Sequence, residues 1–330
     1  PPDWAAMNTQ SSKYMIEARG LTRSFGSLVA VNGLDLRIPR GEIYGLVGPD
    51  GAGKSTALRL FCGLIDPHAG EALVDGINPA RHAHAVRDRI GYMPQRFGLY
   101  TDLTVEENLF FYGDLFGVVG NEREDLMAEL LRMTRMEPFR KRLAGNLSGG
   151  MKQKLALMST LLHRPEALFL DEPTNGVDPV SRRDFWTILY RLVREGLTVL
   201  LSTAYLDEAE RCNRVGLMYK GRLIREDSPQ VIRAQMQANC FAITCDHPRE
   251  ARAFLLQQPG VLSAESSAGA LHVFLTENGN LVKQLAAALK TAGQTNVAIE
   301  PVLPSLEDVF IALVRQAERT DKDAPREVTS

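Results

Sequence analysis

One short stretch, Gly48–Ser55, constrains this chain more than any other, because it reads GPDGAGKS. An apolar run with the length of a buried strand, Gly41–Val47, precedes it, and a predicted helix start, Thr56–Cys62, follows. The glycines let backbone N–H groups approach a polyphosphate, and a helix N-terminus adds unpaired donors and a favourable dipole. Lys54 can reach the phosphates and Ser55 can ligate Mg²⁺. A glycine-rich turn with a chance Lys-Ser pair is the alternative, but the strand–loop–helix context favours a nucleotide-binding loop.

The composition is that of a globular protein and excludes several classes. The chain has 330 residues, of which 45% are apolar and 24% charged, so we expect two domains or one domain with an appendage. The formal net charge of -2 gives no sign of a nucleic-acid partner. No stretch of about 18 residues is free of charge, so we expect no membrane span, and no secretory signal is visible. The polar residues 1–13 are expected to be disordered.

Strands and helices alternate after the glycine-rich loop, which indicates a largely parallel sheet. Two strands before the loop, Tyr14–Leu21 and Gly33–Ile38, read as an antiparallel pair. Later strands are expected within Asp66–Gly76 and at Ile90–Gln95, Ala167–Leu170, Thr198–Thr203 and Val215–Tyr219, and helices at Thr104–Phe116, Glu122–Thr134, Lys152–His163 and Leu206–Cys212, with another from Asp178-Pro179. Beyond Met236 the order becomes β-α-β-β-α-β with a final helix Leu306–Ala317, the ferredoxin-like order, and no catalytic residues are visible there.

Two further motifs carry chemistry. The apolar strand Ala167–Leu170 runs directly into Asp171 and Glu172, and adjacent carboxylates at the end of a buried strand are costly unless they are used. A strand-end Asp suits Mg²⁺, and a neighbouring Glu suits the positioning or deprotonation of a water. A solvated carboxylate pair is the alternative. The segment Leu147–Met151, LSGGM, opens a helix and is either a second anion site or a plain N-cap turn.

Aromatic residues leave two interpretations open. Phe25 either packs under the core or stacks on an adenine, and its spacing alone favours packing. The helix Thr104–Phe116 begins with a capping box from Thr104 to Glu107 and is rich in aromatic residues. Those aromatic side chains form either a helical core, which we favour, or a docking surface for a partner helix.

Taken together, these motifs resemble the ATP-binding subunit of an ABC transporter. The resemblance covers roughly Met15–Met236 and rests on five motifs in the family's order: the loop GPDGAGKS, MPQ ending at Gln95, LSGGM, ALFLDE at 167–172 and NGVDP at Asn175–Pro179. The C-terminal part, with PSLEDVF at Pro304–Phe310, resembles the accessory domain of ABC-2 type multidrug exporters.

The resemblance implies a fold and its domain limits. It implies an α/β P-loop NTPase of the ABC ATPase type, with a mixed sheet, an antiparallel β subdomain and a helical subdomain at about 96–146. The ATPase domain would span 14–236. A small ferredoxin-like α+β accessory domain would span 237–317, and a disordered tail 318–330.

The resemblance also assigns roles to residues. The ATP phosphates would be held by Gly48, Pro49, Asp50, Gly51, Ala52, Gly53, Lys54, Ser55 and Thr56. Mg²⁺ would be held by Ser55, Gln95 and, through water, Asp171, while Glu172 would polarise the attacking water. Phe25 falls at the adenine-stacking position, which reverses the preference for packing. Ser148, Gly149 and Gly150 would contact ATP on a second ATPase domain, with Asp178 at the interface between the two.

Three positions depart from the family pattern. Asp50 replaces the usual Asn, and Met151 replaces the usual Gln. Ala204 replaces a switch histidine that contacts the γ-phosphate and helps to place the water. The loss of one transition-state contact typically lowers a rate by about 10²–10³. Neither His163 nor His247 is placed to substitute, so the site either hydrolyses ATP slowly or manages without the histidine.

The functional expectation is an ATP-hydrolysing subunit that powers an ABC-2 type exporter by ATP-driven dimerisation. Its partners would be a second ABC ATPase domain, in a homodimer or a paralogous heterodimer, and a multi-span permease, and it would lie on the cytoplasmic face of the membrane. One alternative is a catalytically impaired subunit in an asymmetric pair or a regulator, since such combinations resemble the first half of exporters with two fused ATPase domains. The other is a soluble ABC ATPase without a transport role, which the single ATPase domain and short helical insert disfavour.

Overall fold

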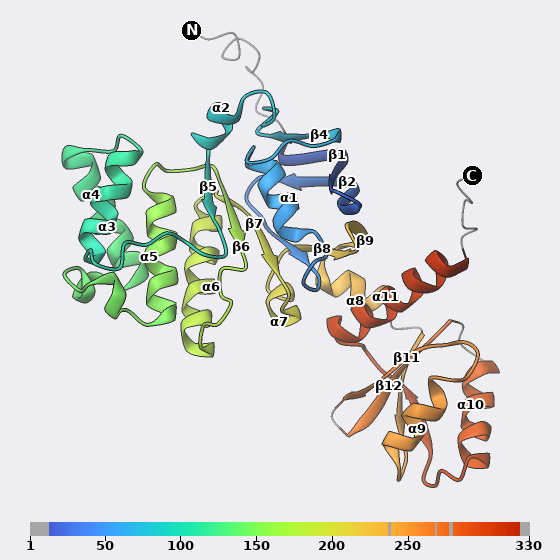
Figure 1. The fold of residues 1–330 in the computed structure, drawn as a ribbon. Coiled ribbons are helices and arrows are strands. Elements are labelled where there is room, and N and C mark those ends of the chain that lie inside the picture. The colour runs from blue at the N-terminus through green and yellow to red at the C-terminus, as the bar shows by residue number, and fades with distance from the viewer. Residues whose placement is uncertain (1–12, 237–238, 268, 277–279, 324–330) are drawn as a thin grey trace. The chain divides into compact units, whose positions relative to one another are not determined.

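The computed structural model describes residues 13–236, 239–267, 269–276 and 280–323. The chain forms two compact units, which divide between Leu223 and Ile224 (Figure 1). The domain limits of 14–236 and 237–317 drawn from the sequence remain a prediction. No helix among the described residues is long and apolar enough to cross a membrane.

A six-stranded sheet forms the centre of the first unit. Its strand order is β5-β6-β7-β3-β8-β9, with bounds β3 (Ile43–Val47), β5 (Ile90–Met93), β6 (Ala167–Asp171), β7 (Thr198–Thr203), β8 (Arg214–Tyr219) and β9 (Arg222–Asp227). Its strands β5, β6, β7, β3 and β8 are parallel, and β9 at its edge continues into the second unit. Every residue of β3, β6 and β7 is buried, as expected of parallel strands that are covered on both faces. In this register Asp171 lies opposite Ser202, and Val47 lies opposite Thr203. The carboxyl ends of three central strands therefore meet at one edge.

An antiparallel sheet of order β2-β1-β4 lies at one end of the unit, formed by β1 (Tyr14–Phe25), β2 (Leu28–Pro39) and β4 (Ala69–Val74). The first two strands are longer than their sequence pattern predicted. Phe25 pairs with Leu28 across a tight hairpin turn, so strand pairing extends through the polar residues after Leu21. This sheet shares a hydrophobic core with the helix after β3.

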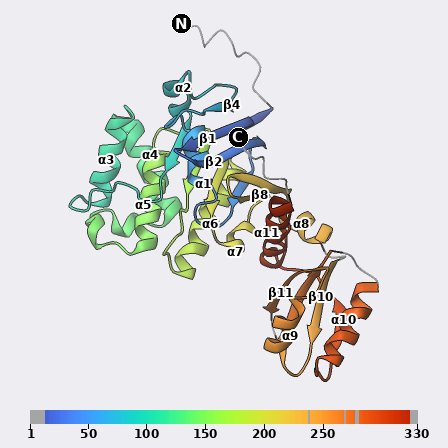
Figure 2. The same cartoon turned by 45° about the vertical axis from the view of Figure 1, so that its right-hand side comes forward.

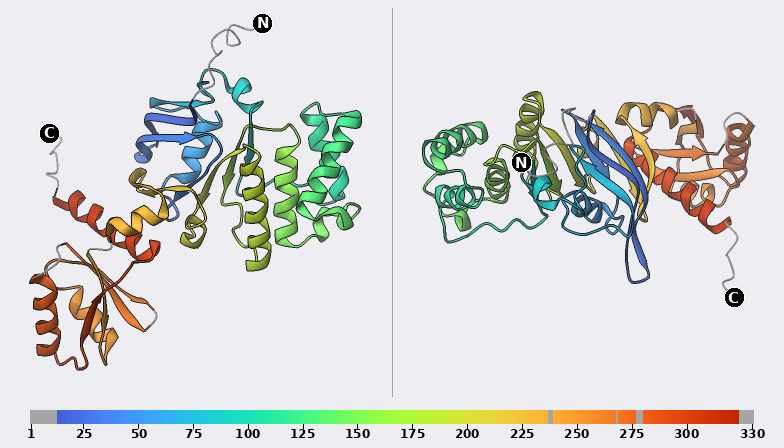
Figure 3. Two further views of the ribbon diagram at one scale, coloured as in Figure 1. Left: turned by 180° about the vertical axis from the view of Figure 1, so that it is seen from behind. Right: turned by 90° about the horizontal axis from the view of Figure 1, so that it is seen from above.

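Helices cover the central sheet and form a group of their own. Their bounds are α1 (Lys54–Phe61), α2 (Ala83–Arg87), α3 (Val105–Leu115), α4 (Gly120–Thr134), α5 (Gly149–Leu161), α6 (Pro179–Arg194) and α7 (Leu206–Ala209), with short 3₁₀ turns η1 (Glu137–Phe139) and η2 (Ala144–Asn146). Figures 1 and 3 show α3 and α4 beside α5, at the opposite end of the unit from β1 and β2. This group is the expected helical subdomain. The predicted capping box is confirmed, because Glu107 N donates to Thr104 Oγ1 at 3.2 Å and Thr104 N donates to Glu107 Oε2 at 2.7 Å.

Helix α5 starts earlier than predicted, at Gly149 instead of Lys152. The cause is its cap: Ser148 Oγ accepts a hydrogen bond from Met151 N at 3.3 Å, so the two glycines lie inside the first turn. Helix α7 is shorter than predicted and ends at Ala209 instead of Cys212.

The second unit has the predicted β-α-β-β-α-β order. It contains α8 (Pro229–Met236), β10 (Cys240–Thr244), α9 (Pro248–Leu255), β11 (Val261–Ser267), β12 (Ala270–Leu275), α10 (Asn280–Thr291), β13 (Ala298–Pro301) and α11 (Leu306–Asp323). The strand order β11-β12-β10-β13 is antiparallel throughout, which confirms the ferredoxin-like α+β fold. Helix α11 continues past the predicted end at Ala317 to Asp323, so the first part of the expected disordered tail is helical. The rest of that tail, and residues 1–12, lie outside the described residues.

The two faces of the four-stranded sheet hold different helices. Leu271 and Val273 of β12 belong to the core formed with α9 and α10. Because side chains alternate along a strand, His272 lies on the other face, where its Nδ1 is 2.8 Å from Asp308 Oδ2 of α11. Figure 2 shows α11 and the α9–α10 pair around this sheet. The same Asp308 carboxylate accepts from Ser305 N at 3.0 Å and from Ser305 Oγ at 2.8 Å, so it closes the first turn of α11.

We expect Asp308→Ala to loosen the start of α11. The change removes the acceptor for Ser305 and the partner of His272, at a cost of about 1–2 kcal/mol, as for a lost helix cap. Hydrogen exchange of the first α11 amides measures the effect. Glu307→Ala, an exposed acidic neighbour, serves as the control, and equal exchange in the two variants would contradict the assignment.

The loop between β3 and α1 depends on glycine at two positions for different reasons. Gly51 has φ 76° and Gly53 has φ 104°, both in the left-handed region. A Cβ at Gly51 would meet nothing within 4 Å. A Cβ at Gly53 would collide with the carbonyl oxygen of Ala30 and press on Met218.

Gly53→Ala is therefore expected to lower the melting temperature by more than Gly51→Ala. Both changes cost roughly 1–2 kcal/mol of backbone strain, but only the first adds a collision with the neighbouring strand. Thermal unfolding of the two purified variants beside the native chain tests this. Equal shifts would show that the contact between this loop and β2 is not tight.

Candidate functional site

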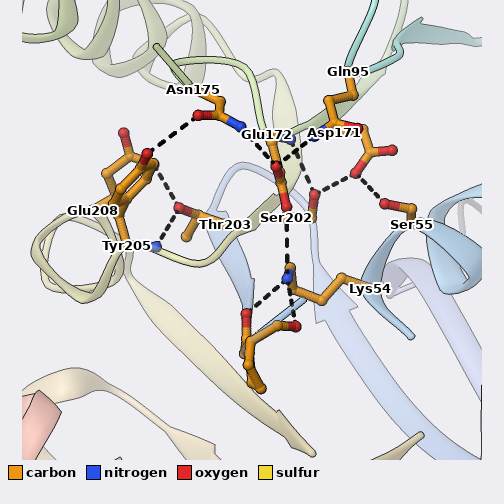
Figure 4. A network of polar contacts seen from close by, with 12 residues as sticks. Lys54, Ser55, Gln95, Asp171, Glu172, Asn175, Ser202, Thr203, Tyr205 and Glu208 are labelled. Atoms are coloured by element: carbon orange, nitrogen blue, oxygen red, sulfur yellow. Dashed lines mark hydrogen bonds and ion pairs between the residues drawn. The ribbon is translucent and has the colours of Figure 1, made fainter. Parts of the chain in front are cut away.

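A buried carboxylate lies where strands β3, β6 and β7 end (Figure 4). Asp171, the last residue of β6, is 1% exposed. Its Oδ1 accepts hydrogen bonds from Ser55 Oγ at 2.7 Å and from Ser202 Oγ at 2.6 Å. Two hydroxyl donors thus compensate the burial of one charge. They also join the first turn of α1 to the ends of two strands.

Lys54 lies over the glycine-rich loop and is 4% exposed. Its Nζ donates to Gly48 O at 2.7 Å and to Pro49 O at 3.0 Å, and it lies 3.6 Å from Glu172 Oε1. Helix α1 has no side-chain cap, so the N–H groups of its first turn face the loop without such a partner. A buried ammonium and an open helix N-terminus in one place fit a polyphosphate.

Glu172 has an unusual backbone and several donors around its side chain. Its φ of 50° is in the left-handed region, and its N–H donates to Ser202 O and Ser202 Oγ, both at 3.1 Å. Its Oε2 accepts from Gln95 Nε2 at 2.8 Å and from Asn175 Nδ2 at 3.2 Å. Strained backbone of this kind is concentrated at functional sites. The structure therefore brings together Lys54, Gln95 and Glu172, three residues predicted from separate motifs.

The oxygen atoms in this region suit Mg²⁺ bound together with a nucleotide. Ser55, Asp171 and Gln95 carry the hard oxygen ligands that Mg²⁺ prefers, and the first two already touch. Among the described residues there is no group of three or more His, Cys, Asp or Glu side chains that could hold a metal ion. Mg²⁺ in nucleotide sites binds through one or two carboxylates, substrate phosphates and water.

Burial and Asp171 together affect two neighbouring groups. Burial raises the pKa of the Cys62 thiol well above its usual value, and the Asp171 charge raises that pKa further. The pKa of Tyr92 is raised by the same two causes in the same order. Both groups therefore stay protonated beside the carboxylate, and neither supplies a nucleophile.

The LSGGM motif and Asp178 lie together but apart from the phosphate loop. A Cβ on Gly150 of α5 would collide with Ser181 of α6, so the starts of the two helices are in contact. Asp178 caps α6 by accepting from Ser181 N at 2.9 Å and Val180 N at 3.1 Å, and these hydrogen bonds lower its pKa. In the described part of the chain, no hydrogen bond or ion pair joins Ser148, Gly149, Gly150 or Asp178 to the phosphate loop.

Three other predicted positions are exposed. Phe25 is 47% exposed, and the Arg23 guanidinium lies 4.9 Å from its ring centre. The alternative that Phe25 packs under the core is therefore wrong, and its role at the adenine stays a prediction. Asp50 is at the surface of the loop, where its charge is solvated, and Ala204 follows β7 with an exposed methyl group.

The preference for a helical core among the aromatic residues of the predicted helix Thr104–Phe116 is wrong, because none of them is buried: Phe110 and Tyr112 are half-buried and the other two are exposed. Phe111 is 39% and Phe116 is 41% exposed, whereas the buried residues of α3 are Val105, Asn108, Leu109 and Gly113. Phe116 stacks on His163, with 4.2 Å between ring centres. Between α3, α5 and β5 lies a mainly apolar groove of about 250 Å³, whose lining includes Leu64, Tyr92, Phe97, Tyr112, Phe116 and His163. We refer to it as the aromatic groove.

The sequence analysis gave no role to Ser202 or to Asn175. Ser202 contacts both carboxylate residues, and a polar residue at the end of a buried strand was the available signal. Asn175 contacts Glu172 through a turn between the two, because its N–H also donates to Glu172 O at 3.2 Å. Its position three residues after a strand-end carboxylate was a weaker signal.

Comparisons with known proteins agree with this geometry. The family model for the ABC transporter matches residues 31–175. The probable multidrug ABC transporter ATP-binding protein YbhF of Escherichia coli is 42% identical over 306 residues, which are 91% of this chain and 52% of that protein. This chain thus spans about half the length of that relative.

Other relatives are matched over nearly their whole length. The Nod factor export ATP-binding protein I of Rhizobium sp. (strain N33) is 35% identical over 92% of this chain and 97% of its own. The daunorubicin resistance ATP-binding protein DrrA2 of Streptomyces coeruleorubidus is 32% identical over 95% and 98%.

Solved structures match the first unit's fold. An ATP-binding subunit of an ABC transporter is 30% identical with a TM-score of 0.61, over 67% of this chain and 92% of that one. The ATP-binding cassette MJ0796, solved as a dimer bound to ADP and Pi, is 28% identical with a TM-score of 0.58, over 65% and 98%. Motifs, site geometry and full-length relatives thus agree, and the chain belongs to the ATP-binding proteins of ABC transporters, a family of ATPases.

Proposed function

We propose that this chain binds and hydrolyses ATP to power export through a separate membrane permease. One observation carries the proposal: Lys54, Gln95 and Glu172 converge at the strand ends, next to Ser55 and Asp171. These are the groups that phosphoryl transfer to water requires, namely a phosphate-binding cation, oxygen ligands for a metal and a carboxylate for the water. The names of the full-length relatives support an export role.

The residues divide the work by their chemistry. Lys54 and the backbone of residues 48–56 would hold the phosphates, and Ser55, Gln95 and Asp171 would hold Mg²⁺, the last through water. Bound Mg²⁺ supplies charge neutralisation at the phosphates. Glu172 would orient the attacking water and accept its proton, because its carboxylate lies beside both the lysine and the metal ligands. Phe25 offers an exposed ring for the adenine.

We also propose that catalysis needs a second ATPase domain. At the starts of α5 and α6, one surface is formed by Ser148, Gly149, Gly150 and Asp178, and no hydrogen bond or ion pair within the described residues joins them to the phosphate loop of their own chain. Ser148 caps only one N–H group at the start of α5, and the positive end of that helix dipole attracts phosphate, so this surface fits ATP held by another domain. The dimeric MJ0796 structure supports this arrangement. The second domain is a copy of this chain or a paralogue.

The aromatic groove is the proposed docking place for a multi-span permease of the ABC-2 type. Phe97, two residues after Gln95 in the sequence, lines this groove, and Phe116 and Leu64 are exposed to solvent there. Exposed aromatic side chains next to a concave apolar surface are typical of protein interfaces. Docking there would place the chain on the cytoplasmic face of the membrane and would connect the permease to Gln95.

ATP hydrolysis by the purified chain tests the proposed activity. Lys54→Ala and Glu172→Gln are each expected to lower steady-state turnover by about 10²-fold or more, because each removes a group that acts on the reacting phosphate or water. Ala204→His is expected to change turnover by less than about threefold, because Asn175 donates to Glu172 without a contribution from residue 204. Single-turnover and steady-state assays measure both effects.

The second candidate, an impaired subunit of an asymmetric pair, makes the opposite prediction for one variant. It is motivated by Ala204, which offers only a methyl group at the position of the usual histidine. If the native chain binds ATP but hardly hydrolyses it, and Ala204→His raises hydrolysis strongly, the proposal that this chain is an active ATPase is wrong.

Phe116→Asp is expected to release the chain from its permease without lowering its own ATP hydrolysis. A charge on the wall of the aromatic groove should weaken docking by about tenfold or more, the effect typical of losing an aromatic side chain that an interface buries. The measurement is recovery of the chain with membranes that contain a co-expressed candidate permease. Leu303→Asp, at a 52% exposed position in the second unit, is the matched control. Equal recovery of the two variants would locate docking elsewhere.

A further inference from the structure

Three donors surround the Glu172 carboxylate, and under the proposed function two of them also bind the nucleotide or its metal. Lys54 would turn to the phosphates and Gln95 to the metal, so both are drawn away from Glu172 when nucleotide binds. Asn175, whose Nδ2 lies 3.2 Å from Glu172 Oε2, is the remaining donor within the described residues. The orientation of Asn175 therefore decides whether Glu172 stays in place during hydrolysis.

The hydroxyl of Tyr205 determines that orientation. It donates to Asn175 Oδ1 at 3.2 Å (Figure 4). A carboxylate can only accept hydrogen bonds, so the amide must present its NH₂ to Glu172 and its oxygen to Tyr205. The two contacts specify the same amide orientation, and each strengthens the other.

Tyr205 is itself held from several directions. Its N–H donates to Thr203 Oγ1 at 3.0 Å, and the Arg182 guanidinium lies 4.8 Å from its ring centre. Arg182 in turn pairs with Asp207 at 3.3 Å and with Glu208 at 3.5 Å. The tyrosine ring is thus restricted on its face and at its backbone, and the hydroxyl is directed at Asn175.

A buried glutamate, Glu208, bonds to both the segment that carries Tyr205 and the segment that carries Asn175. Glu208 is 1% exposed, and its carboxylate accepts from Thr203 Oγ1 at 2.8 Å and from Thr174 Oγ1. Thr203 is the last residue of β7, two positions before Tyr205, and Thr174 precedes Asn175 in the turn after β6. The Glu208 carboxylate therefore connects the turn that carries Asn175 to the turn that carries Tyr205.

We propose that Tyr205 is a positioning residue for ATP hydrolysis, acting through Asn175 to hold Glu172. We refer to Tyr205, Asn175 and Glu172 as the tyrosine relay. It rests on the proposed function and deepens it, because it explains how the water-orienting carboxylate is fixed although Ala204 provides no donor. The relay is formed entirely within this chain, whereas the surface at Ser148 acts on another domain.

Tyr205→Phe removes only the hydroxyl and keeps the ring under Arg182. The expected result is a fall in kcat of about tenfold, the effect typical of lost partners that orient a catalytic ligand, with KM for MgATP changed by less than about twofold. Tyr190→Phe is the matched control, because Tyr190 is 37% exposed against 39% for Tyr205. Its hydroxyl donates to a group outside this site, Arg211 O, in a hydrogen bond of 3.1 Å. An unchanged kcat in Tyr205→Phe, or an equal loss in Tyr190→Phe, overturns the relay.

A double-mutant cycle separates positioning from a general structural effect. Asn175→Ala should lower kcat at least as much as Tyr205→Phe, and the double variant should be no slower than Asn175→Ala alone. If the fold-loss of kcat in the double variant equals the product of the two single losses, Tyr205 acts independently of Asn175. Thermal unfolding of each variant identifies any that fail to fold.

One readout does not depend on turnover. In ¹⁵N-labelled native chain the side-chain amide signals of Asn175, assigned with Asn175→Asp, should shift in Tyr205→Phe and stay in place in Tyr190→Phe. If the native chain does not hydrolyse ATP, the proposed function fails, and the shift of these amide signals becomes the test of the contact between Tyr205 and Asn175. Signals that do not move in Tyr205→Phe overturn it in either case.

Discussion

The buried charge of Asp171 is the constraint on which the site depends. At 1% exposure a carboxylate is stable only with donors around it, and the donors come from Ser55 on α1 and Ser202 on β7. Meeting this need fixes the distance between the phosphate loop and two strand ends. The same short hydrogen bonds place a hydroxyl and a carboxylate oxygen side by side, as a metal held with phosphates requires. The atoms that compensate the buried charge are therefore the same atoms that we propose for metal binding.

The adjacent Glu172, the proposed catalytic carboxylate, is held outside regular structure. It follows the strand in a left-handed backbone conformation, so the sheet no longer fixes its side chain. Its position depends on three side-chain donors: Lys54 and Gln95 from two other segments, and Asn175 from its own turn. A group held in this way can respond when nucleotide binding engages two of the three.

Local patterns made most of the fold predictable. The glycine-rich loop, the strand–helix alternation and the capping box at Thr104 all depend on residues close in sequence, and the structure confirms them. The exposure of Phe111 and Phe116 was not predictable, because an aromatic helix has the same composition whether its ring faces are covered or open. The length of β1 was missed for a related reason, since pairing with β2 overrides the polar sequence after Leu21.

The residues that carry the cation, the hydroxyl and the two carboxylates at the strand ends were predictable from the sequence. Those residues lie within or directly after single elements, where spacing specifies position. The contacts of Gln95 and Asn175 with one carboxylate oxygen, and of Tyr205 with Asn175, became visible in the folded chain alone. These contacts join turns after β5, β6 and β7, and only the parallel register of the strands brings such distant turns together.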